Sequence, residues 1–374
     1  MSPAGAGDHR VTIAGGGIAA LEAVLALRAV AGDVAIELLS PAARSDYQPL
    51  AVLEPFAFGE MPVLDLRRFA AEQRASLRRD TLVAVEAGAR EIVTGRGERC
   101  PYDVLVVATG ASTVEAVPGA HTFHGHVDRR EAGLLVEEYA EGSLKRLAFA
   151  VPAGEAWALP AYELALMTRT MLSDRGVTDV DLAVVTPEER PLELFGPTVS
   201  RAIGKLLADA SVDVYAGAAP DRFEDGALHL AGGTQVEADR VVALPRLVGR
   251  RFAGLPADER GFVPTDEHGR VDGHPDVYAA GDAAAFPVKQ GGLAAQQADT
   301  VAAAIAARFG AGPEPPPFRP ALHGLLMTGK VAFHLEPEDG EHPGLHPAPW
   351  SPPEKVFGRY LLPYLTGGKT LPLA

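Results

Sequence analysis

An aspartate stands where an apolar run ends. Residues 277–280 read VYAA and lead into Gly281-Asp282, and small residues then continue as far as Lys289-Gln290-Gly291-Gly292. Aspartate is a poor strand former, and its burial without a partner costs free energy. A carboxylate at the carboxyl end of a buried strand accepts hydrogen bonds from a polyol, and the glycine before it leaves room. We therefore expect a sugar-like ligand at Asp282.

A glycine-rich turn near the start of the chain is a second candidate site. Gly15-Gly16-Gly17 lies between a β-rich run, Arg10–Ala14, and a strong helix former, Ile18–Val30. Gly15, Gly17 and Ala20 fit the pattern G-x-G-x-x-A, in which the chain turns tightly and helix N–H groups hold a pyrophosphate. A strand-to-helix turn without a ligand is the alternative interpretation.

Two further segments bear on the same site. The second strand, residues 33–40, ends in Ser40 where an acidic residue usually binds a ribose, while Glu37 falls inside the strand. Ser40 can donate or accept one hydrogen bond in its place. Residues 102–110 (YDVLVVATG) form an apolar run that ends in Thr109-Gly110. Such a run suits a buried parallel strand whose carboxyl end opens on a ligand crevice.

These three motifs, in this order, resemble those of the flavoproteins with two dinucleotide domains. Among these flavoproteins, the motifs are similar to those of sulfide:quinone reductases, flavocytochrome c sulfide dehydrogenases and type II NADH dehydrogenases. The resemblance implies that VTIAGGGIAALEA holds the FAD pyrophosphate, that YDVLVVATGA crosses beneath the FAD and that VYAAGDAAAFP carries the ribityl ligand. The FAD-binding residues are then Gly15, Gly17, Ala20, Ser40, Thr109, Gly110, Gly281, Asp282 and Gly292.

The residues after Asp282 are candidates for catalysis. Residues 293–309 are rich in alanine and favour a long helix. A helix that begins near Gly291 or Gly292 would turn its positive end toward the pyrimidine side of the flavin. Lys289 and Gln290 are then expected beside the isoalloxazine. Alternatively, Lys289 is a solvated loop residue, and Gln296-Gln297 form a polar helix face.

A second nucleotide domain is expected in the middle of the chain. Residues 144–151 and 159–172 predict a strand and a helix, but the PAGEAWA segment between them lacks the usual glycine triplet and keeps Gly154 alone. The resemblance places Glu163 at the glutamate of the second family pattern and Glu188 near an adenosine ribose. Trp157 either shields a nicotinamide or substrate pocket or packs at a domain seam. The resemblance argues for NAD(P)H, and the missing glycines argue against it.

The last part of the chain carries one more candidate. WSPPEK, residues 350–355, resembles the closing W-x-P-P-x-K segment of sulfide:quinone reductase relatives, which covers the quinone side of the flavin. Lys355 either approaches the active site or lies on the surface of a proline-rich loop. The proline-rich residues 313–320 predict a stiff, extended linker.

Composition excludes several classes of function. The 374 residues carry 49 Asp and Glu against 34 Lys and Arg, and a net charge of −15 disfavours nucleic acid and anionic lipid. The single cysteine, Cys100, excludes a redox disulfide and a cysteine metal cluster. His121, His124 and His126 complete no established metal motif. A basic leader and an apolar run of about 20 residues are both missing, so we expect a cytoplasmic chain without a stable membrane anchor.

The sequence thus predicts an α/β fold with two Rossmann-like dinucleotide-binding domains in three layers. The FAD domain is expected to be discontinuous, with residues 1–113 and 241–312 on either side of a second domain at 114–240. Residues 313–374 are expected to cover the flavin and acceptor side.

The predicted function is that of an FAD-dependent oxidoreductase, neither a sulfide nor a disulfide enzyme. It would pass two electrons from a donor, most simply NAD(P)H, to a quinone or another small acceptor. The alternative is a flavin-binding electron-transfer or redox-sensing protein that does not turn over pyridine nucleotide. Small-molecule donor and acceptor are the expected partners, and a homodimer is left open.

Overall fold

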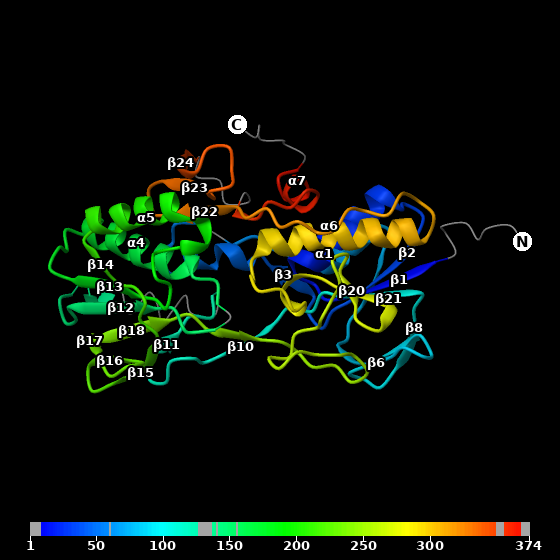
Figure 1. The fold of residues 1–374 in the computed structure, drawn as a ribbon, viewed down its shortest axis with the longest axis horizontal. Coiled ribbons are helices and arrows are strands. Elements are labelled where there is room, and N and C mark those ends of the chain that lie inside the picture. Colours follow the sequence, from blue (N-terminus) through cyan, green and yellow to red (C-terminus); the bar gives the residue numbers. More distant parts are fainter. Residues whose placement is uncertain are drawn as a thin grey trace, which may run out of the picture.

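Two parallel β-sheets occupy the two halves of an elongated molecule (Figure 1). The structure is a computed structural model that describes residues 9–59, 61–125, 137–139, 141–154, 156–348 and 355–367. His126, residues 350–354 of the W-x-P-P-x-K motif and residues 368–374 lie outside this part. The α/β fold with two dinucleotide-binding sheets agrees with the prediction.

The first sheet has six strands in the order β20-β21-β9-β1-β2-β5, and only β20 runs antiparallel to its neighbour. All four residues of β9 are buried, which fits its place in the centre of the sheet. In order along the chain the strands are β1 (Arg10–Ala14), β2 (Ala35–Leu39), β5 (Ser76–Arg78), β9 (Val104–Val107), β20 (Arg270–Val271) and β21 (His274–Ala279).

Helices cover one face of this sheet and a small antiparallel sheet covers the other. Helices α1 (Ile18–Val30) and α6 (Gly291–Arg308) pack against each other on the upper face (Figure 1). The lower face carries β6 (Leu82–Glu86), β7 (Glu91–Thr94) and β8 (Arg99–Pro101). Shorter elements join these layers, namely β3 (Arg44–Asp46), η2 (Gln48–Phe56), β4 (Val63–Asp65), α2 (Leu66–Glu72) and η5 (Gly281–Ala283).

The second sheet has five parallel strands in the order β11-β18-β12-β13-β14. Successive side chains of β12 point to opposite faces of the sheet. Leu147 and Phe149 face the helices, whereas Ala148 and Ala150 face a three-stranded meander. These strands are β11 (His121–Thr122), β12 (Arg146–Ala150), β13 (Asp181–Val185), β14 (Val212–Tyr215) and β18 (Arg240–Ala243). The covering elements are α4 (Leu159–Asp174), η4 (Glu193–Phe195), α5 (Pro197–Asp209) and the meander β15 (Pro220–Glu224), β16 (Ala227–Leu230) and β17 (Gln235–Glu237).

One strand lies elsewhere than the sequence suggested. The segment around β18 was expected to return toward the first domain, but β18 pairs with β11 and β12 inside the second sheet. Its apolar RVVA sequence suits a strand that is buried on both faces. The chain instead crosses between the halves at an antiparallel pair, β10 (Ser112–Val114) and β19 (Arg246–Val248). The domain bounds remain a prediction.

A three-stranded antiparallel sheet and a short helix follow the long helix α6. The apolar run from Gly324 to Leu335 forms a strand pair, β22 (Gly324–Met327) and β23 (Ala332–Glu336), and a third strand, β24 (Gly344–Ala348), pairs with β23. The predicted linker at 313–320 contains no helix or strand. In the described part of the chain, every helix is too short or too polar to cross a membrane.

The short helix α7 (Leu361–Leu365) is attached to α1 by a buried carboxylate. Glu22 of α1 accepts hydrogen bonds of 2.7 Å from the backbone N–H groups of both Tyr360 and Leu361. Asp299 of α6 lies close to Glu22, and burial together with the charge of Glu22 raises the pKa of Asp299 to about 8. The positive charge of Arg359 opposes that rise in pKa. Two acidic groups therefore share this junction of α1, α6 and α7.

Candidate functional site

The glycine loop after β1 is packed on one side and open on the other. Gly15 has φ +142°, and a Cβ there would lie 2.0 Å from the carbonyl oxygen of Ala108. Gly17 is the N-cap residue of α1, and a Cβ on it would meet no atom within 4 Å. Ala20 is fully buried one turn into the helix. The unpaired N–H groups at the start of α1 thus border open space, as a pyrophosphate site requires.

That open space is a cleft with about 820 Å³ of empty volume, including its mouth. Ser40 lines it at the end of β2, where its Oγ accepts a 3.3 Å hydrogen bond from the N–H of Ala42. Thr109 also lines it, and the Thr109 Oγ1 is buried without a hydrogen-bond partner in the described structure. The next residue, Gly110, has φ +67° and leaves open space where a Cβ would stand. The cleft also includes Gly15–Gly17, Pro41, Thr81, Leu82 and Phe252.

Asp282 lies where the sequence predicted, directly after β21. Its carboxylate is half-buried, and no described residue donates a hydrogen bond to it. Burial raises the pKa of Asp282, and the positive charge of Lys289 partly opposes this rise. A carboxylate in this position costs free energy unless a ligand donates to it. The hydroxyl groups of a flavin ribityl chain meet that requirement.

Gly281 lets helices α1 and α6 approach each other beside Asp282. Gly281 has φ +70°, and a Cβ on it would lie 2.9 Å from the Cβ of Ala19. Its N–H donates a 2.7 Å hydrogen bond to Oε1 of Gln297, a buried residue of α6. Gln297 therefore fixes the turn that carries Asp282, a role that the sequence reading of Gln296-Gln297 as a polar helix face missed. This role could not be read from the local sequence, because the hydrogen bond joins two residues that are 16 positions apart in the chain.

Lys289 and Gln290 have different surroundings before α6. Lys289 is 5% exposed, so the solvated-loop alternative is wrong. Its Nζ lies 3.6 Å from the centre of the Phe262 ring and donates to the carbonyl oxygen of Ala284. Gln290 caps α6, which begins at Gly291 as predicted. Its Oε1 accepts from the N–H of Leu293 at 2.8 Å, and its Nε2 donates to the carbonyl oxygen of His323 at 3.1 Å.

The first turn of α6 shows why glycine stands beside this cap. A Cβ on Gly292 would lie 2.9 Å from Oε1 of Gln290, so a larger residue would disturb the capping side chain. The side chain of Gln290 is thus committed to the protein. The positive end of α6 and the ammonium of Lys289 lie on the side of the turn that carries Asp282. Direct contact of Lys289, Gln290 or Gly292 with the flavin remains a prediction.

Lys355 and Glu163 form a buried ion pair, although the sequence assigned them to different sites. The Nζ of Lys355 lies 2.6 and 2.5 Å from the two carboxylate oxygens of Glu163. Oε1 of Glu163 also accepts a 2.9 Å hydrogen bond from the N–H of Met327 in β22. Lys355 is 7% exposed and Glu163 is fully buried, so the surface-loop alternative for Lys355 is wrong.

Burial acts on both members of this pair. It raises the pKa of the Glu163 carboxyl and lowers the pKa of the Lys355 ammonium, while each partner's charge opposes the shift of the other. The pair joins α4 to the C-terminal segment. The carboxylate of Glu163 is occupied by protein groups, and its predicted contact with a nucleotide or substrate remains untested.

The other candidates of the second domain lie near the carboxyl ends of β12 and β13. Gly154 is exposed in the loop before α4, with φ +99°. Oε2 of Glu188 accepts from the hydroxyl of Tyr162 at 2.7 Å and from Thr186 Oγ1 at 3.0 Å. The ring of Trp157 lies 6.0 Å from that of Phe195, centre to centre, and packs on the domain core. This contact favours the packing interpretation of Trp157.

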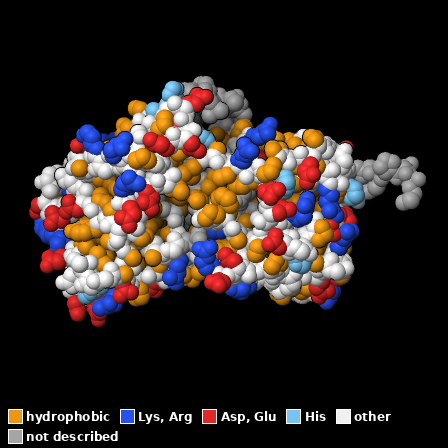
Figure 2. Space-filling view, in the orientation of Figure 1, with side chains coloured by type: hydrophobic (Ala, Val, Ile, Leu, Met, Phe, Trp, Pro, Cys, Tyr) orange, Lys and Arg blue, Asp and Glu red, His pale blue; other side chains and the backbone are white. Residues whose placement is uncertain are grey.

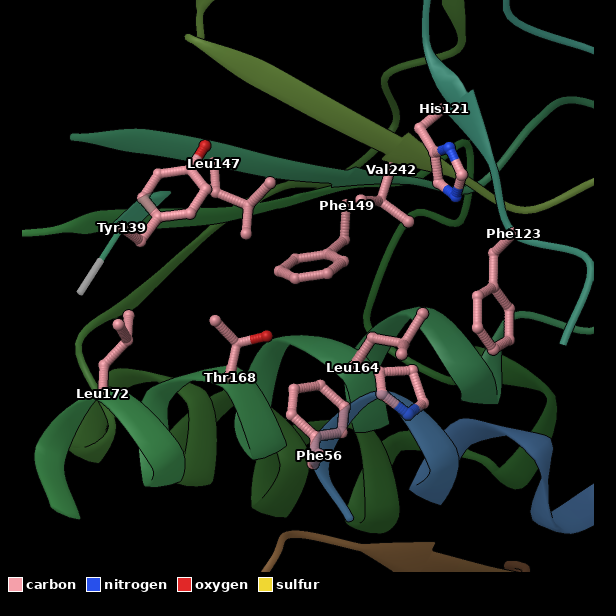
Figure 3. Close-up of a pocket in the computed structure, with 11 residues that line it drawn as sticks. Phe56, His121, Phe123, Tyr139, Leu147, Phe149, Leu164, Thr168, Leu172 and Val242 are labelled. Carbon is pink, nitrogen blue, oxygen red and sulfur yellow. The ribbon is translucent and has the colours of Figure 1, made fainter. Parts of the chain in front are cut away.

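A second cavity lies between the second sheet and α4 (Figure 3). His121 of β11 and Phe149 of β12 face it from the sheet, and Leu164 and Thr168 face it from α4, with Phe56 beside them. The empty space between these side chains is about 470 Å³ when the open solvent at its mouth is included, and its lining is almost entirely apolar. Among the residues with described positions, no three His, Cys, Asp or Glu side chains gather as a metal site would require.

Comparison with known proteins identifies the family. The model of the pyridine nucleotide-disulphide oxidoreductases matches residues 9–307. An NADH dehydrogenase-like protein of Mycobacterium tuberculosis is 28% identical over 54% of this chain and 54% of its own length, so the chain spans about half of that relative. The type II NADH:quinone oxidoreductase NdhA of the same organism is 28% identical over 79% of this chain and 71% of its own.

The fold has a close match among solved structures. The sulfide:quinone oxidoreductase of Aquifex aeolicus superposes with a TM-score of 0.83 at 20% identity, over 91% of this chain and 87% of that one. The single cysteine of the present chain, Cys100, is buried, and burial raises the pKa of its thiol. A redox disulfide within the chain is impossible. The open glycine loop, the unpartnered Thr109 hydroxyl and the donor-free Asp282 all fit FAD, and the chain belongs to the pyridine nucleotide-disulphide oxidoreductase family with FAD as its cofactor.

Proposed function

We propose that this FAD-dependent oxidoreductase passes two electrons from NADH through the flavin to a quinone. The observation that carries the flavin site is the Asp282 carboxylate, half-buried and without a donor among the described residues. The relative that supports the choice of NADH and quinone is NdhA, because its alignment covers most of both chains.

Each half of the chain supplies part of the proposed chemistry. Bound FAD supplies the two-electron step. Asp282 would orient it by accepting hydrogen bonds from the ribityl chain. Lys289 and the N-terminus of α6 place positive charge on this side of the site, where it stabilises negative charge that develops on reduction.

The donor would bind at the carboxyl ends of β12 and β13. Glu188 is held there by Tyr162 and Thr186, so its carboxylate is fixed in orientation. A carboxylate at this position binds the ribose hydroxyls of NADH and repels the 2′-phosphate of NADPH. NADH is therefore the proposed donor.

The acceptor would lie on the side covered by the C-terminal segment. A quinone takes up protons together with electrons, and the buried pair of Lys355 and Glu163 holds a proton inside the protein. Sulfide and disulfide substrates are excluded from the proposal because Cys100 has no partner cysteine.

A visible spectrum followed by anaerobic reduction tests the proposal. The purified protein should show an oxidised-flavin band that bleaches with NADH and only slowly with NADPH, and a short-chain ubiquinone analogue should restore the band. Glu188→Gln should slow the bleaching by NADH at low nucleotide concentration. Glu189→Gln is the matched control, because it removes the neighbouring exposed carboxylate.

The alternative is a flavin protein that does not turn over pyridine nucleotide. The observation in its favour is the loop before α4, where Gly154 stands without the other glycines of a nucleotide-binding triplet. A yellow protein that dithionite reduces, but that neither nucleotide bleaches, would establish this alternative and refute NADH as the donor. A protein that cannot bind FAD at all would overturn both.

A further inference from the structure

Two arginines that line the FAD cleft have no hydrogen-bond or ion-pair partner among the described residues. Arg44 follows β2 by a short loop, Arg250 follows β19, and both line the cleft of the glycine loop. Neither guanidinium makes a hydrogen bond or an ion pair with any residue that the structure describes. Across the β3–β4 pair, Arg44 stands opposite Asp65. The pKa of that carboxyl is lowered mainly by the hydrogen bond from the N–H of Arg68, and the charge of Arg44 adds a smaller contribution. Asp46 is the acidic residue in the lining.

The arginines around the cleft behave differently. Arg78 is paired with Glu37 at 2.9 Å, and Arg79 donates hydrogen bonds of 3.1 and 2.7 Å to the carbonyl oxygen of Pro41. Arg251, next to Arg250, donates to the carbonyl oxygens of Asp258 and Glu259, each at 2.8 Å. The guanidinium groups of Arg78, Arg79 and Arg251 are thus satisfied by the protein, unlike those of the two arginines that line the cleft.

The cleft also lacks the acidic ribose ligand of its fold. Ser40 stands at the end of β2, and Glu37 is turned to Arg78. The carboxylate that would anchor the adenosine ribose from the end of β2 is therefore missing. A guanidinium presents several N–H donors in a fork that matches phosphate oxygens, so two free arginines supply an anchor of the opposite charge.

We propose that Arg44 and Arg250 clamp the adenosine diphosphate half of FAD through its phosphate oxygens, in place of a carboxylate on the ribose. The two arginines approach from different segments of the chain, at the start of β3 and after β19. The connection that returns from the second domain therefore takes part in holding the cofactor. The expected ligand chemistry is a dianionic diphosphate, and free ADP should occupy the same cleft.

Release of FAD from the holoprotein tests this clamp without recourse to activity. Diluted wild-type protein, Arg44→Gln, Arg250→Gln and the double variant are compared by the rise in flavin fluorescence as FAD leaves. Each single variant should release FAD about tenfold faster, and the double variant faster still, because each loses a charge-assisted contact. Added salt should speed release from the wild type more than from the double variant.

Arg251→Gln is the matched control, since it removes one positive charge from the adjacent position and leaves the cleft lining intact. It should release FAD at the wild-type rate. Equal acceleration in Arg251→Gln, or an unchanged rate in the double variant, would overturn the clamp. A double variant isolated without flavin is titrated with FAD and with ADP. If the double variant has the circular dichroism spectrum of the wild type but binds both FAD and ADP more weakly, the clamp is supported. If the double variant binds ADP as tightly as the wild type does, the clamp is refuted.

Discussion

The carboxylate of Asp282 is the proposed ligand of the ribityl chain of FAD. Its place after β21 was predicted from the sequence, because an aspartate at the end of an apolar run has few structural explanations. The identity of its neighbours was not predicted. Gln297 and Phe262 come from other segments of the chain, and their approach depends on packing that no local pattern encodes.

Replacement of Asp282 should weaken FAD binding. In Asp282→Ala the ribityl chain loses a charged acceptor, a loss of about 1.5–3 kcal/mol, which corresponds to roughly ten- to a hundredfold in affinity. Isothermal titration of deflavinated protein with FAD measures the change. Asp272→Ala, at an exposed turn, is the control. Equal FAD affinity in both variants would rule out Asp282 as the ribityl ligand.

The ion pair of Lys355 and Glu163 should matter for stability. Lys355→Met leaves a buried carboxylate without its counter-charge and should lower the free energy of unfolding by about 3–5 kcal/mol. The double variant Lys355→Met with Glu163→Gln removes both charges, keeps an acceptor for Met327 and should regain most of that loss. Urea unfolding of the holoprotein gives the coupling energy. A double variant as unstable as Lys355→Met would contradict this account.

At the scale of elements, local patterns predicted the strands and helices that flank the glycine loop and the long helix α6. Arg10–Ala14 and Ile18–Val30 have the bounds expected from the sequence, since a short β-rich run, a glycine turn and an unbroken helix former leave little choice. Strand β24 was missed because its GLHPA sequence has weak strand propensity and contains proline. Strand β18 was assigned to the other half because pairing between distant strands leaves no local signal.

The acidic junction of α1, α6 and α7 should make stability depend on pH. The pKa of Asp299 is raised to about 8 from an ordinary 3.8, and burial also raises that of Glu22. At a pH between 3.8 and about 8, Asp299 holds a proton in the folded state that it has released in the unfolded state. Stability should therefore fall as pH rises from about 4 to about 8, by up to about 1.4 kcal/mol per pH unit, and then level off.

The variant Asp299→Asn tests this dependence. It removes one acidic group, while the backbone bonds from Tyr360 and Leu361 to Glu22 remain. The slope of unfolding free energy against pH should become shallower than in the wild type, with the largest gain in stability above pH 8. Denaturant titrations at several pH values measure both slopes. Parallel slopes in the two proteins would show that the junction does not hold the extra proton.

At the scale of the whole molecule, one apolar core joins the two halves. It includes Leu50 and Leu53 of η2, from the first part of the chain, with residues of α4, β12, β22 and the C-terminal segment. Figure 2 shows hydrophobic side chains over the left half and in the middle of the face, between the two halves. The two-sheet architecture was predictable from the order of the motifs. The shared core was not predictable, because the sequence of η2 has no amphipathic pattern that indicates which residues it packs against.

The shared core predicts a single unfolding transition for both sheets. Calorimetry of the holoprotein should give one peak with nearly equal calorimetric and van't Hoff enthalpies. Leu53→Ala should lower the free energy of unfolding by about 2–5 kcal/mol and keep the single peak, because Leu53 is fully buried. Two separate peaks in either protein would show that the halves unfold independently.

The strand order of the first sheet has a consequence for the timing of synthesis. Strand β21, which carries Asp282 at its end, pairs with β9, although most of the second sheet is made between them. When only the first βαβ unit has emerged from the ribosome, the glycine loop is present. Asp282, the proposed ligand of the ribityl chain, has not yet been synthesised. Since domains form as the chain emerges, capture of FAD must wait until the second sheet has been translated. Cells short of flavin would then accumulate a late folding intermediate rather than an early one.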